Sequence, residues 1–415
     1  MARRRQRAGW ALADQVVSSL TNFGMSFFIL RTVDISDFGV FSISFGVFVT
    51  SIAIGRALVG QPVAVRLSDD KAPQRTERAA SSWSFSLFLG TGLGLLSVIA
   101  GFIVSGDLRL SLISLGSALP FLLLQDARRY SYFALAKPER AFASDLIWAV
   151  GQIVAVASIF LWTEQAVWMF IAAWAGTGAL AGLVPLVIER GFAQIRNARG
   201  WLQESRDLGF RFLLESVLQT GAVQVVLVAV AAIAGFDEVG SLSGARTLFG
   251  PMTILLLGAE LFGISEGARL VSQSQALSSF IRSIAIALVA VPLASTAAIW
   301  WLPSDLIAVV VGDNWADVRP LVPLIGLLVA FQGLAWAYRI GLRSIADAAS
   351  SLRAQVLTGP AILCGGIVGA AAEGALGAAI GLVIAHALSA VWFYRGFSAS
   401  LQSTTGPLTA DEVHA

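Results

Sequence analysis

Apolar stretches of about twenty residues recur from one end of the chain to the other, separated by short polar connectors. A helix of that length crosses roughly 30 Å of hydrocarbon. Hydropathy averaged along the sequence predicts about twelve such spans. They cover residues 10–30, 38–59, 83–104, 110–133, 141–162, 166–189, 209–233, 241–263, 279–301, 320–342, 354–371 and 375–397. The pattern therefore predicts an all-α, polytopic membrane protein of about twelve transmembrane helices.

The first predicted span carries a polar stripe. Asp14, Ser18, Asn22 and Ser26 recur every four residues, which places them on one face of a helix. Lipid cannot satisfy the hydrogen bonds of such groups, so the stripe must face protein or a water-filled cavity. We therefore expect the hairpin at residues 8–68 to line a polar cavity.

The same hairpin returns later in the chain. With an offset of 201 residues, Asp37 falls on Glu238 and Asp14 falls on Glu215. Matching halves are typical of transporters, in which the substrate site lies between them. The repeat predicts two pseudo-symmetric six-helix lobes. The expected divisions are an N-terminal lobe at 1–190, a cytoplasmic linker at 191–207, a C-terminal lobe at 208–397 and a disordered cytoplasmic tail at 398–415.

The linker contains Trp201 and several arginines, and two interpretations of it stay open. An amphipathic segment of this kind can lie on the anionic membrane surface. A simple solvated linker explains the same composition.

Composition supports the membrane class. Of the 415 residues, 56% are hydrophobic and 13% are charged, and the mean hydropathy is +0.77, whereas soluble domains carry about 25% charged residues. The lone cysteine, Cys364, cannot form an internal disulfide. Two histidines provide no metal-ligand cluster, and the sequence has no Gly-Lys-Ser/Thr nucleotide-binding loop. We expect no metal, no cofactor and no nucleic-acid partner.

Charge alternates between successive connectors. Arginine and lysine gather before the first span and after spans two, four, six, eight, ten and twelve, whereas acidic residues dominate the other connectors. Positive connectors face the cytoplasm. The expected location is the bacterial cytoplasmic (inner) membrane, with both termini on the cytoplasmic side.

Charged residues inside the spans are the candidate functional residues, because a charge in hydrocarbon is costly. Arg246 lies in span eight and Arg56 in the inner part of span two, with Arg31 and Arg66 nearer the two membrane surfaces. Arginine binds phosphate through two hydrogen bonds, so this set suits an anionic substrate. The predicted substrate-binding residues are Arg246, Arg56, Arg31, Arg66, Asn22, Gln61, Gln219 and Gln224.

Acidic residues in the spans are candidates for coupling or gating, namely Asp14, Glu215, Glu260 and Asp126. Structural roles compete with these interpretations. The side chains near the inner boundary, Arg56, Arg66, Asp14 and Glu215, can extend into the headgroups. Asp126 can pair with Arg129 on its own helix. Arg246 has apolar neighbours and no acid one turn further on, so it is the strongest functional candidate.

Two short motifs carry a family resemblance. Residues 33–41 (Val-Asp-Ile-Ser-Asp-Phe-Gly-Val-Phe) are similar to a first outer turn, and residues 311–317 (Val-Gly-Asp-Asn-Trp-Ala-Asp) to a Gly-acid-x-aromatic element before span ten. In both respects the chain resembles the polysaccharide (Wzx-type, oligosaccharidyl-lipid) flippase family. That family belongs to the multidrug/oligosaccharidyl-lipid/polysaccharide exporter (MOP) superfamily.

The resemblance implies a fold and a function. It implies two pseudo-symmetric lobes around a central cationic cavity lined by helices one, two, seven and eight. It implies flipping of polyprenyl-diphosphate-linked oligosaccharide by alternating access, for surface polysaccharide biosynthesis. Arg56 and Arg246 then occupy the places on helices two and eight where cavity arginines occur. The implied partners are the lipid-linked oligosaccharide, membrane lipid, and a polysaccharide polymerase and glycosyltransferases.

Three other classes remain open. A multidrug or cation antiporter shares the fold but usually needs a buried acid in its cavity. A major-facilitator sugar transporter also has twelve spans, but its Gly-x-x-x-Asp-Arg/Lys-x-Gly loop is missing after span two. A polytopic enzyme of polysaccharide assembly usually carries a large outer loop, whereas the only long outer connector here is 302–319. We expect a transporter and not an enzyme.

Overall fold

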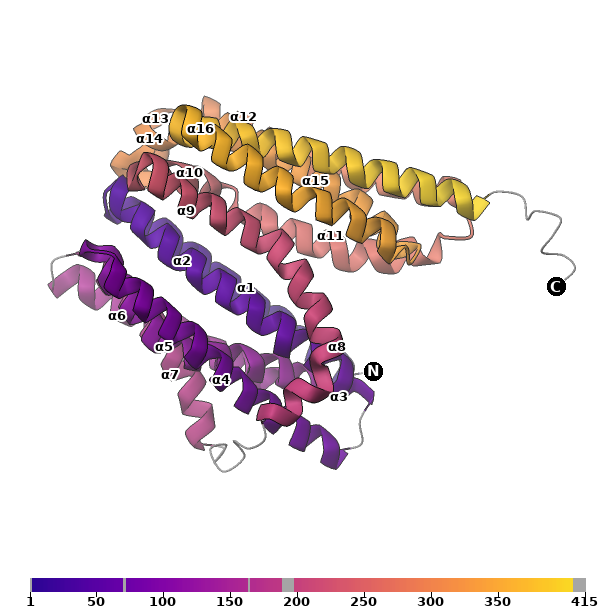
Figure 1. Cartoon of the computed structure of the whole chain (residues 1–415), viewed down its shortest axis with the longest axis horizontal. Coiled ribbons are helices and arrows are strands. Elements are labelled where there is room, and N and C mark those ends of the chain that lie inside the picture. The colour runs from indigo at the N-terminus through magenta and orange to yellow at the C-terminus, as the bar shows by residue number, and fades with distance from the viewer. Residues whose placement is uncertain (1, 70–71, 163–164, 189–197, 406–415) are drawn as a thin grey trace, which may run out of the picture. The chain divides into compact units, whose positions relative to one another are not determined.

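The computed structural model describes residues 2–69, 72–162, 165–188 and 198–405, and within these ranges it is helical without strands (Figure 1). The second predicted span begins as α2, passes through a π-helical turn, η1, and ends as α3. The helices of the first half are α1 (Ala2–Thr32), α2 (Ile35–Gly55), η1 (Arg56–Gly60), α3 (Gln61–Asp69), α4 (Ala72–Ile103), α5 (Gly106–Ala134), α6 (Pro138–Trp162) and α7 (Val167–Ile188).

The second half repeats the pattern of long helices. Its elements are α8 (Ala198–Ser216), the π-helical turn η3 (Val217–Gly221), α9 (Ala222–Ala234), α10 (Phe236–Leu248), α11 (Gly250–Arg269), α12 (Ser274–Trp301), α13 (Ser304–Val311), η4 (Gly312–Asn314), α14 (Trp315–Val318), η5 (Arg319–Leu321), α15 (Val322–Ser344) and α16 (Ala348–Thr405). The short helix α13 lies in the long connector at 302–319.

The predicted all-α class and the predicted spans are confirmed. Nine stretches of the described residues are long and apolar enough to cross a membrane. One of these contains α16, which Glu373 and Gly374 divide because their backbone angles are not helical. The polar α1 and the pair α10–α11, broken at Phe249, account for the remaining predicted spans.

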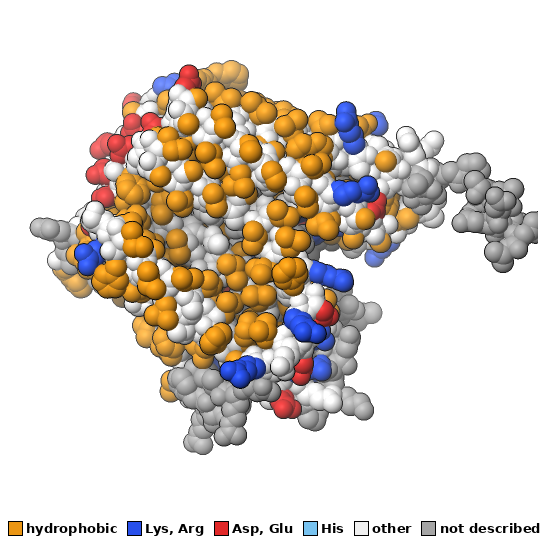
Figure 2. Space-filling view, viewed as in Figure 1, with side chains coloured by type: hydrophobic (Ala, Val, Ile, Leu, Met, Phe, Trp, Pro, Cys, Tyr) orange, Lys and Arg blue, Asp and Glu red, His pale blue; other side chains and the backbone are white. Residues whose placement is uncertain are grey.

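The flanks of the helices are apolar. Figure 2 shows hydrophobic side chains over both halves of the chain. On α4, Phe88, Leu96 and Ile103 expose 70%, 63% and 81% of their surface. An exposed apolar face of this extent suits contact with lipid. Asp305, Asp313 and Asp317 are exposed around α13 and α14.

Polar side chains fix two of the connectors. Asp34 lies at the N-cap of α2 and accepts a hydrogen bond from the backbone N–H of Asp37 at 2.8 Å. Asp347 lies in the α15–α16 connector and accepts from the backbone N–H of Ser350 at 2.9 Å. That bond and one from the Ser400 hydroxyl lower the pKa of Asp347 to about 2.

Contacts divide the chain into two compact units. Unit 1 contains Met1–Val228, Gly235–Gly240 and Val311–Asn314, and unit 2 contains Ala229–Ala234, Ser241–Val310 and Trp315–Ala415. The lobe boundaries predicted from the sequence stay a prediction. Within the expected linker, 198–207 is helical and the rest lies outside the described residues. The expected tail is helical up to Thr405, and 406–415 lies outside the described residues.

Two glycines of unit 1 mark a reciprocal crossing of α2 and the start of α10. A Cβ added at Gly39 would overlap the backbone oxygen of Phe236, and one added at Gly240 would overlap that of Ile35. Both pairs obey the offset of 201 residues, since Ile35 corresponds to Phe236 and Gly39 to Gly240. The two copies of the hairpin therefore touch through equivalent atoms, and only glycine permits this approach.

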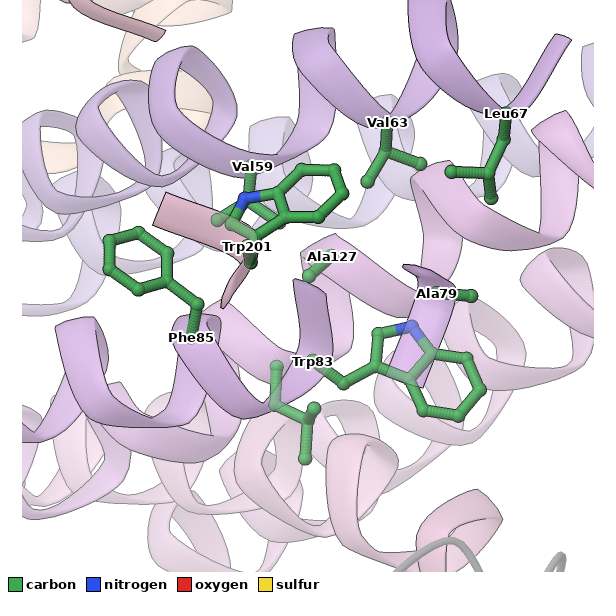
Figure 3. Packing of buried hydrophobic residues seen from close by; sticks show 9 residues of the cluster. Val59, Val63, Leu67, Ala79, Trp83, Phe85, Ala127 and Trp201 are labelled. Atoms are coloured by element: carbon green, nitrogen blue, oxygen red, sulfur yellow. The ribbon is translucent and has the colours of Figure 1, made fainter. Parts of the chain in front are cut away.

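The position of Trp201 contradicts both interpretations of the linker, as a membrane-surface segment and as a solvated connection. It is 1% exposed and belongs to the hydrophobic core of unit 1 instead of lying at a membrane or solvent surface. Figure 3 shows it beside Val59 and Phe85. The cluster comprises Val59, Val63, Leu67, Ala79, Trp83, Phe85, Leu124, Ala127 and Trp201. Helix α8 is therefore anchored to unit 1.

Candidate functional site

Arg56 begins the π-helical turn of the second span and pairs with Asp126 of α5. Its Nη2 lies 2.8 Å from Oδ1 of Asp126, and its Nε lies 3.1 Å from Oδ2. The ring of Tyr130 lies 6.0 Å from the guanidinium carbon. The Arg56 side chain remains 41% exposed, whereas that of Asp126 is 9% exposed. Asp126 thus pairs with Arg56 and not, as the sequence had suggested, with Arg129 of its own helix. The guanidinium of Arg56 has five N–H donors, so some remain for a second anion.

The π-helical turn has an identifiable cause. Pro62 has no backbone N–H, so the carbonyl of Leu58, four residues earlier, loses its α-helical partner. The indole Nε1 of Trp201 donates to this Leu58 oxygen at 3.1 Å. On the opposite side, Gly60 leaves room for the ring of Tyr130, since a Cβ there would lie 3.0 Å from that ring.

Asp14 belongs to a second charged group in unit 1. It is fully buried, and its Oδ2 accepts from Nε of Arg129 at 2.9 Å. Arg129 also lies 3.3 Å from Oδ2 of Asp145, whose Oδ1 accepts from Gln125 at 2.6 Å. Asp14 is therefore buried against protein instead of extending into headgroups. The sequence had indicated Arg129 only as a partner of Asp126, and Gln125 was missed as a participant although its position inside span four was visible.

The polar stripe of α1 packs within unit 1. Asn22 accepts a bond from the indole of Trp174 at 3.3 Å and donates to the backbone oxygen of Ser18 at 2.9 Å. Ser26 donates to the backbone oxygen of Asn22 at 3.1 Å. The stripe satisfies the requirement that it face polar partners. Asn22 was predicted to bind substrate, but both polar atoms of its side chain already form hydrogen bonds within unit 1.

The remaining unit 1 candidates lie apart from Arg56. Arg66 pairs with Asp207 of α8 at 2.8 Å, and its side chain is 26% exposed. Arg31 is exposed at the end of α1, and Gln61 is partly exposed. Near Arg31, Asn314 donates to the backbone oxygens of Leu30 and Val33 at 2.6 and 2.8 Å, so the outer motif packs on the end of α1.

Arg246 occupies the last turn of α10, directly before the break at Phe249. It is partly exposed, and within the described part of the chain its side chain has no hydrogen bond or ion pair. Its charge lies within electrostatic range of His386. The carboxyl end of α10 favours a cation there, which is a structural contribution. No described carboxylate holds Arg246, in contrast to Arg56.

Glu260 of α11 is engaged by three side chains of α15. It accepts from the indole of Trp336 at 3.0 Å and from Arg339 at 3.4 Å, and it pairs with Arg343. Arg339 also stacks on Trp336, with 3.8 Å between the guanidinium carbon and the ring centroid. The sequence had singled out Glu260 as a candidate for coupling or gating. In the structure its partners lie on another helix, and it ties α11 to α15.

The predicted residues of span seven lie around η3. Gln219 and Gln224 are partly exposed, and the amide oxygen of Gln224 packs against Gly46 of α2. The side chain of Glu215 lies outside the described residues. The span bends through a π-helical turn, a feature common at functional sites.

Two cavities are apolar. One of about 490 Å³ lies between α1 and α6 and is lined by residues such as Leu20, Gly24 and Phe160. The other, of about 220 Å³, lies in unit 2 beside Leu256 and Leu288. Neither contains the predicted arginines. The central cationic cavity stays a prediction.

Comparison with known proteins places the fold. No protein-family model and no curated protein matches the chain. Solved structures do match. An inward-facing multidrug resistance MATE family transporter of the MOP superfamily shares 14% identity at a TM-score of 0.75, and the match covers 95% of this chain and 100% of that one. The chain has the MOP transporter fold.

Two further structures agree with that fold. The lipid II flippase MurJ in an inward closed conformation shares 11% identity at a TM-score of 0.70, over 94% of this chain and 87% of that one. A MOP superfamily transporter from Pyrococcus furiosus shares 13% identity at a TM-score of 0.62, over 96% and 95%. At these identities the matches show the fold alone, and this chain shares it with those transporters.

Proposed function

We propose that this chain flips a polyprenyl-diphosphate-linked oligosaccharide across the bacterial cytoplasmic membrane by alternating access. The fold alone does not select a substrate, since its neighbours include a multidrug transporter and a lipid II flippase. The charged residues in the spans favour one substrate class over the others. Cationic side chains that retain donors suit a diphosphate, whose charge arginine binds through two parallel bonds.

Arg246 is the observation that carries the proposal. It lies inside a membrane helix beside a helix break, and no described carboxylate neutralises it. An unpaired charge facing lipid is costly, which favours a polar cavity and an anionic ligand. Arg56 is the second binding residue, because its pairing with Asp126 fixes the guanidinium while leaving 41% of the side chain exposed. Arg31, Arg66, Asn22, Gln61, Gln219 and Gln224 complete the proposed path.

Substitution of Arg246 tests this function. Arg246→Ala should abolish surface polysaccharide while the protein accumulates to normal levels. Arg246→Lys should restore little export, because an ammonium group cannot reproduce the two parallel bonds of the guanidinium. The measurement is surface polysaccharide in the producing host, normalised to transporter protein in the membrane.

Arg109→Ala is the matched control. Arg109 is exposed near the start of α5 and contacts only the ring of Phe102 among the aromatic groups, at 5.4 Å. This variant should export normally. Normal export by Arg246→Ala would refute the proposed cationic site.

We also propose that the buried carboxylates of unit 1 couple transport to protons. Asp14 and Asp145 share a single guanidinium, that of Arg129, whereas Asp126 pairs with Arg56. One oxygen each of Asp14 and Asp145 is buried without a hydrogen bond. Uptake of one proton would therefore balance the group and satisfy an oxygen. Glu260 and Glu215 remain secondary candidates for gating.

A multidrug antiporter of the same fold is the second candidate. The two buried carboxylates that share Arg129, Asp14 and Asp145, favour it, since a cationic substrate needs an acid. The Arg246 experiment separates the two functions: loss of polysaccharide without altered drug resistance supports the flippase, and the reverse supports the antiporter.

A further inference from the structure

The inter-lobe helix α8 touches the second span where the α-helical hydrogen bonding is interrupted. Pro62 cannot donate to the carbonyl of Leu58, and the chain opens into the π-helical turn at Arg56–Gly60. An unpaired carbonyl away from water destabilises the fold. Trp201 of α8 supplies the missing donor at 3.1 Å.

The same turn determines where Arg56 points. Arg56 is its first residue, and the bidentate bond to Asp126 forms only if the backbone there keeps its present path. Gly60, its last residue, packs against Tyr130, whose ring lies beside the Arg56 guanidinium. A change in the turn therefore shifts Arg56 relative to Asp126 and Tyr130, the two groups of α5 that orient it.

Several other contacts hold α8 against this region. Arg66 pairs with Asp207, and the side chain of Arg78 lies 3.3 Å from Glu204. Gly209 packs against Leu58 itself. Helix α8 is thus fixed along the two turns that follow Trp201, and the indole cannot leave Leu58 without disturbing the cluster in Figure 3.

We infer that Trp201 is a positioning residue for Arg56: its indole N–H stabilises the π-helical turn that aims the guanidinium at an anionic substrate. This rests on the proposed function, since it deepens the role of Arg56. Helix α8 would then influence the anion site indirectly, through the turn that carries Arg56, and would not itself contact the anion.

Binding of farnesyl diphosphate to the full-length protein in detergent tests the inference. Farnesyl diphosphate is a short probe with the same diphosphate and prenyl chemistry as the proposed substrate. Trp201→Phe keeps an aromatic ring in the core and removes only the donor. We expect its dissociation constant to rise about tenfold, the factor that corresponds to 1.4 kcal/mol.

Trp83→Phe is the matched control. Trp83 belongs to the same cluster, is 7% exposed, and donates one indole bond to Ser131 at 3.0 Å. Its loss should lower the thermal unfolding midpoint as much as Trp201→Phe does, yet leave the affinity for farnesyl diphosphate within about twofold of the original. A merely structural role of Trp201 would give both variants the same binding.

Arg56→Ala separates failure of the inference from failure of the proposed function. If Arg56→Ala loses binding and Trp201→Phe binds normally, the positioning role is overturned and the anion site stands. If Arg56→Ala binds normally, Arg56 is not in the site. Both its proposed role in binding and the positioning role of Trp201 are then refuted. Should Trp201→Phe not fold, Gly60→Ala perturbs the turn from the Tyr130 side and must weaken binding instead.

Discussion

At the scale of single residues, Asp14 is the strongest coupling candidate because it is fully buried and one of its oxygens lacks a hydrogen bond. Asp14→Asn removes the surplus charge, so the group no longer needs a proton. In proteoliposomes, this variant should translocate a fluorescent farnesyl diphosphate analogue at a rate that no longer responds to an imposed pH gradient. Glu204→Gln, which alters an exposed carboxylate of α8, should keep the response. A gradient response retained by Asp14→Asn would exclude Asp14 as the proton carrier.

The sequence could place charged residues on helices, but it could not pair them. Asp14, Asp126 and Glu260 were identifiable because a carboxylate within an apolar run is costly. Their partners Arg129, Arg56 and Arg343 lie 115, 70 and 83 positions away. No local periodicity reports contacts at such separations. Arg246 differs because its lack of acidic neighbours was visible in the local sequence, and its role in substrate binding stays a prediction.

At the scale of elements, the reciprocal crossing of α2 and α10 rests on two glycines. Gly39→Ala and Gly240→Ala should each destabilise the protein by about 1–3 kcal/mol, because each added methyl group meets a backbone oxygen that cannot rotate away. The measurement is the thermal unfolding midpoint in detergent. Gly92→Ala on α4 is the control, since nothing lies within 4 Å of its added Cβ. Removing a helical glycine there should be neutral or stabilising by about 0.5–1 kcal/mol. Equal midpoints for all three variants would contradict the crossing.

The elements themselves followed well from hydropathy, because span length is set by the bilayer. The failures lie where one side chain overrides the local pattern. Pro62 interrupts the second span, and the polar segment around Trp201 is a packed helix because its indole enters the core of unit 1. The composition of the segment could not show that Trp201 packs against residues far away in the sequence.

At the scale of the whole molecule, the distribution of charge predicts the orientation in the membrane. Arginine and lysine precede the first predicted span and follow every second one, whereas Asp305, Asp313 and Asp317 are exposed in the connector around α13, which is predicted to lie outside. Cationic connectors stay in the cytoplasm, and an even number of spans returns the chain to the side where it began. Reporter fusions at Met1 and Ala415 should therefore both report the cytoplasm, and a reporter inserted after Ser304 should report the opposite side. Termini that both report the periplasm would invert the topology, and Arg246 would then lie near the inner surface instead of the outer one. The order in which Arg246 and Arg56 meet the diphosphate would be reversed, so the direction of transport depends on this measurement.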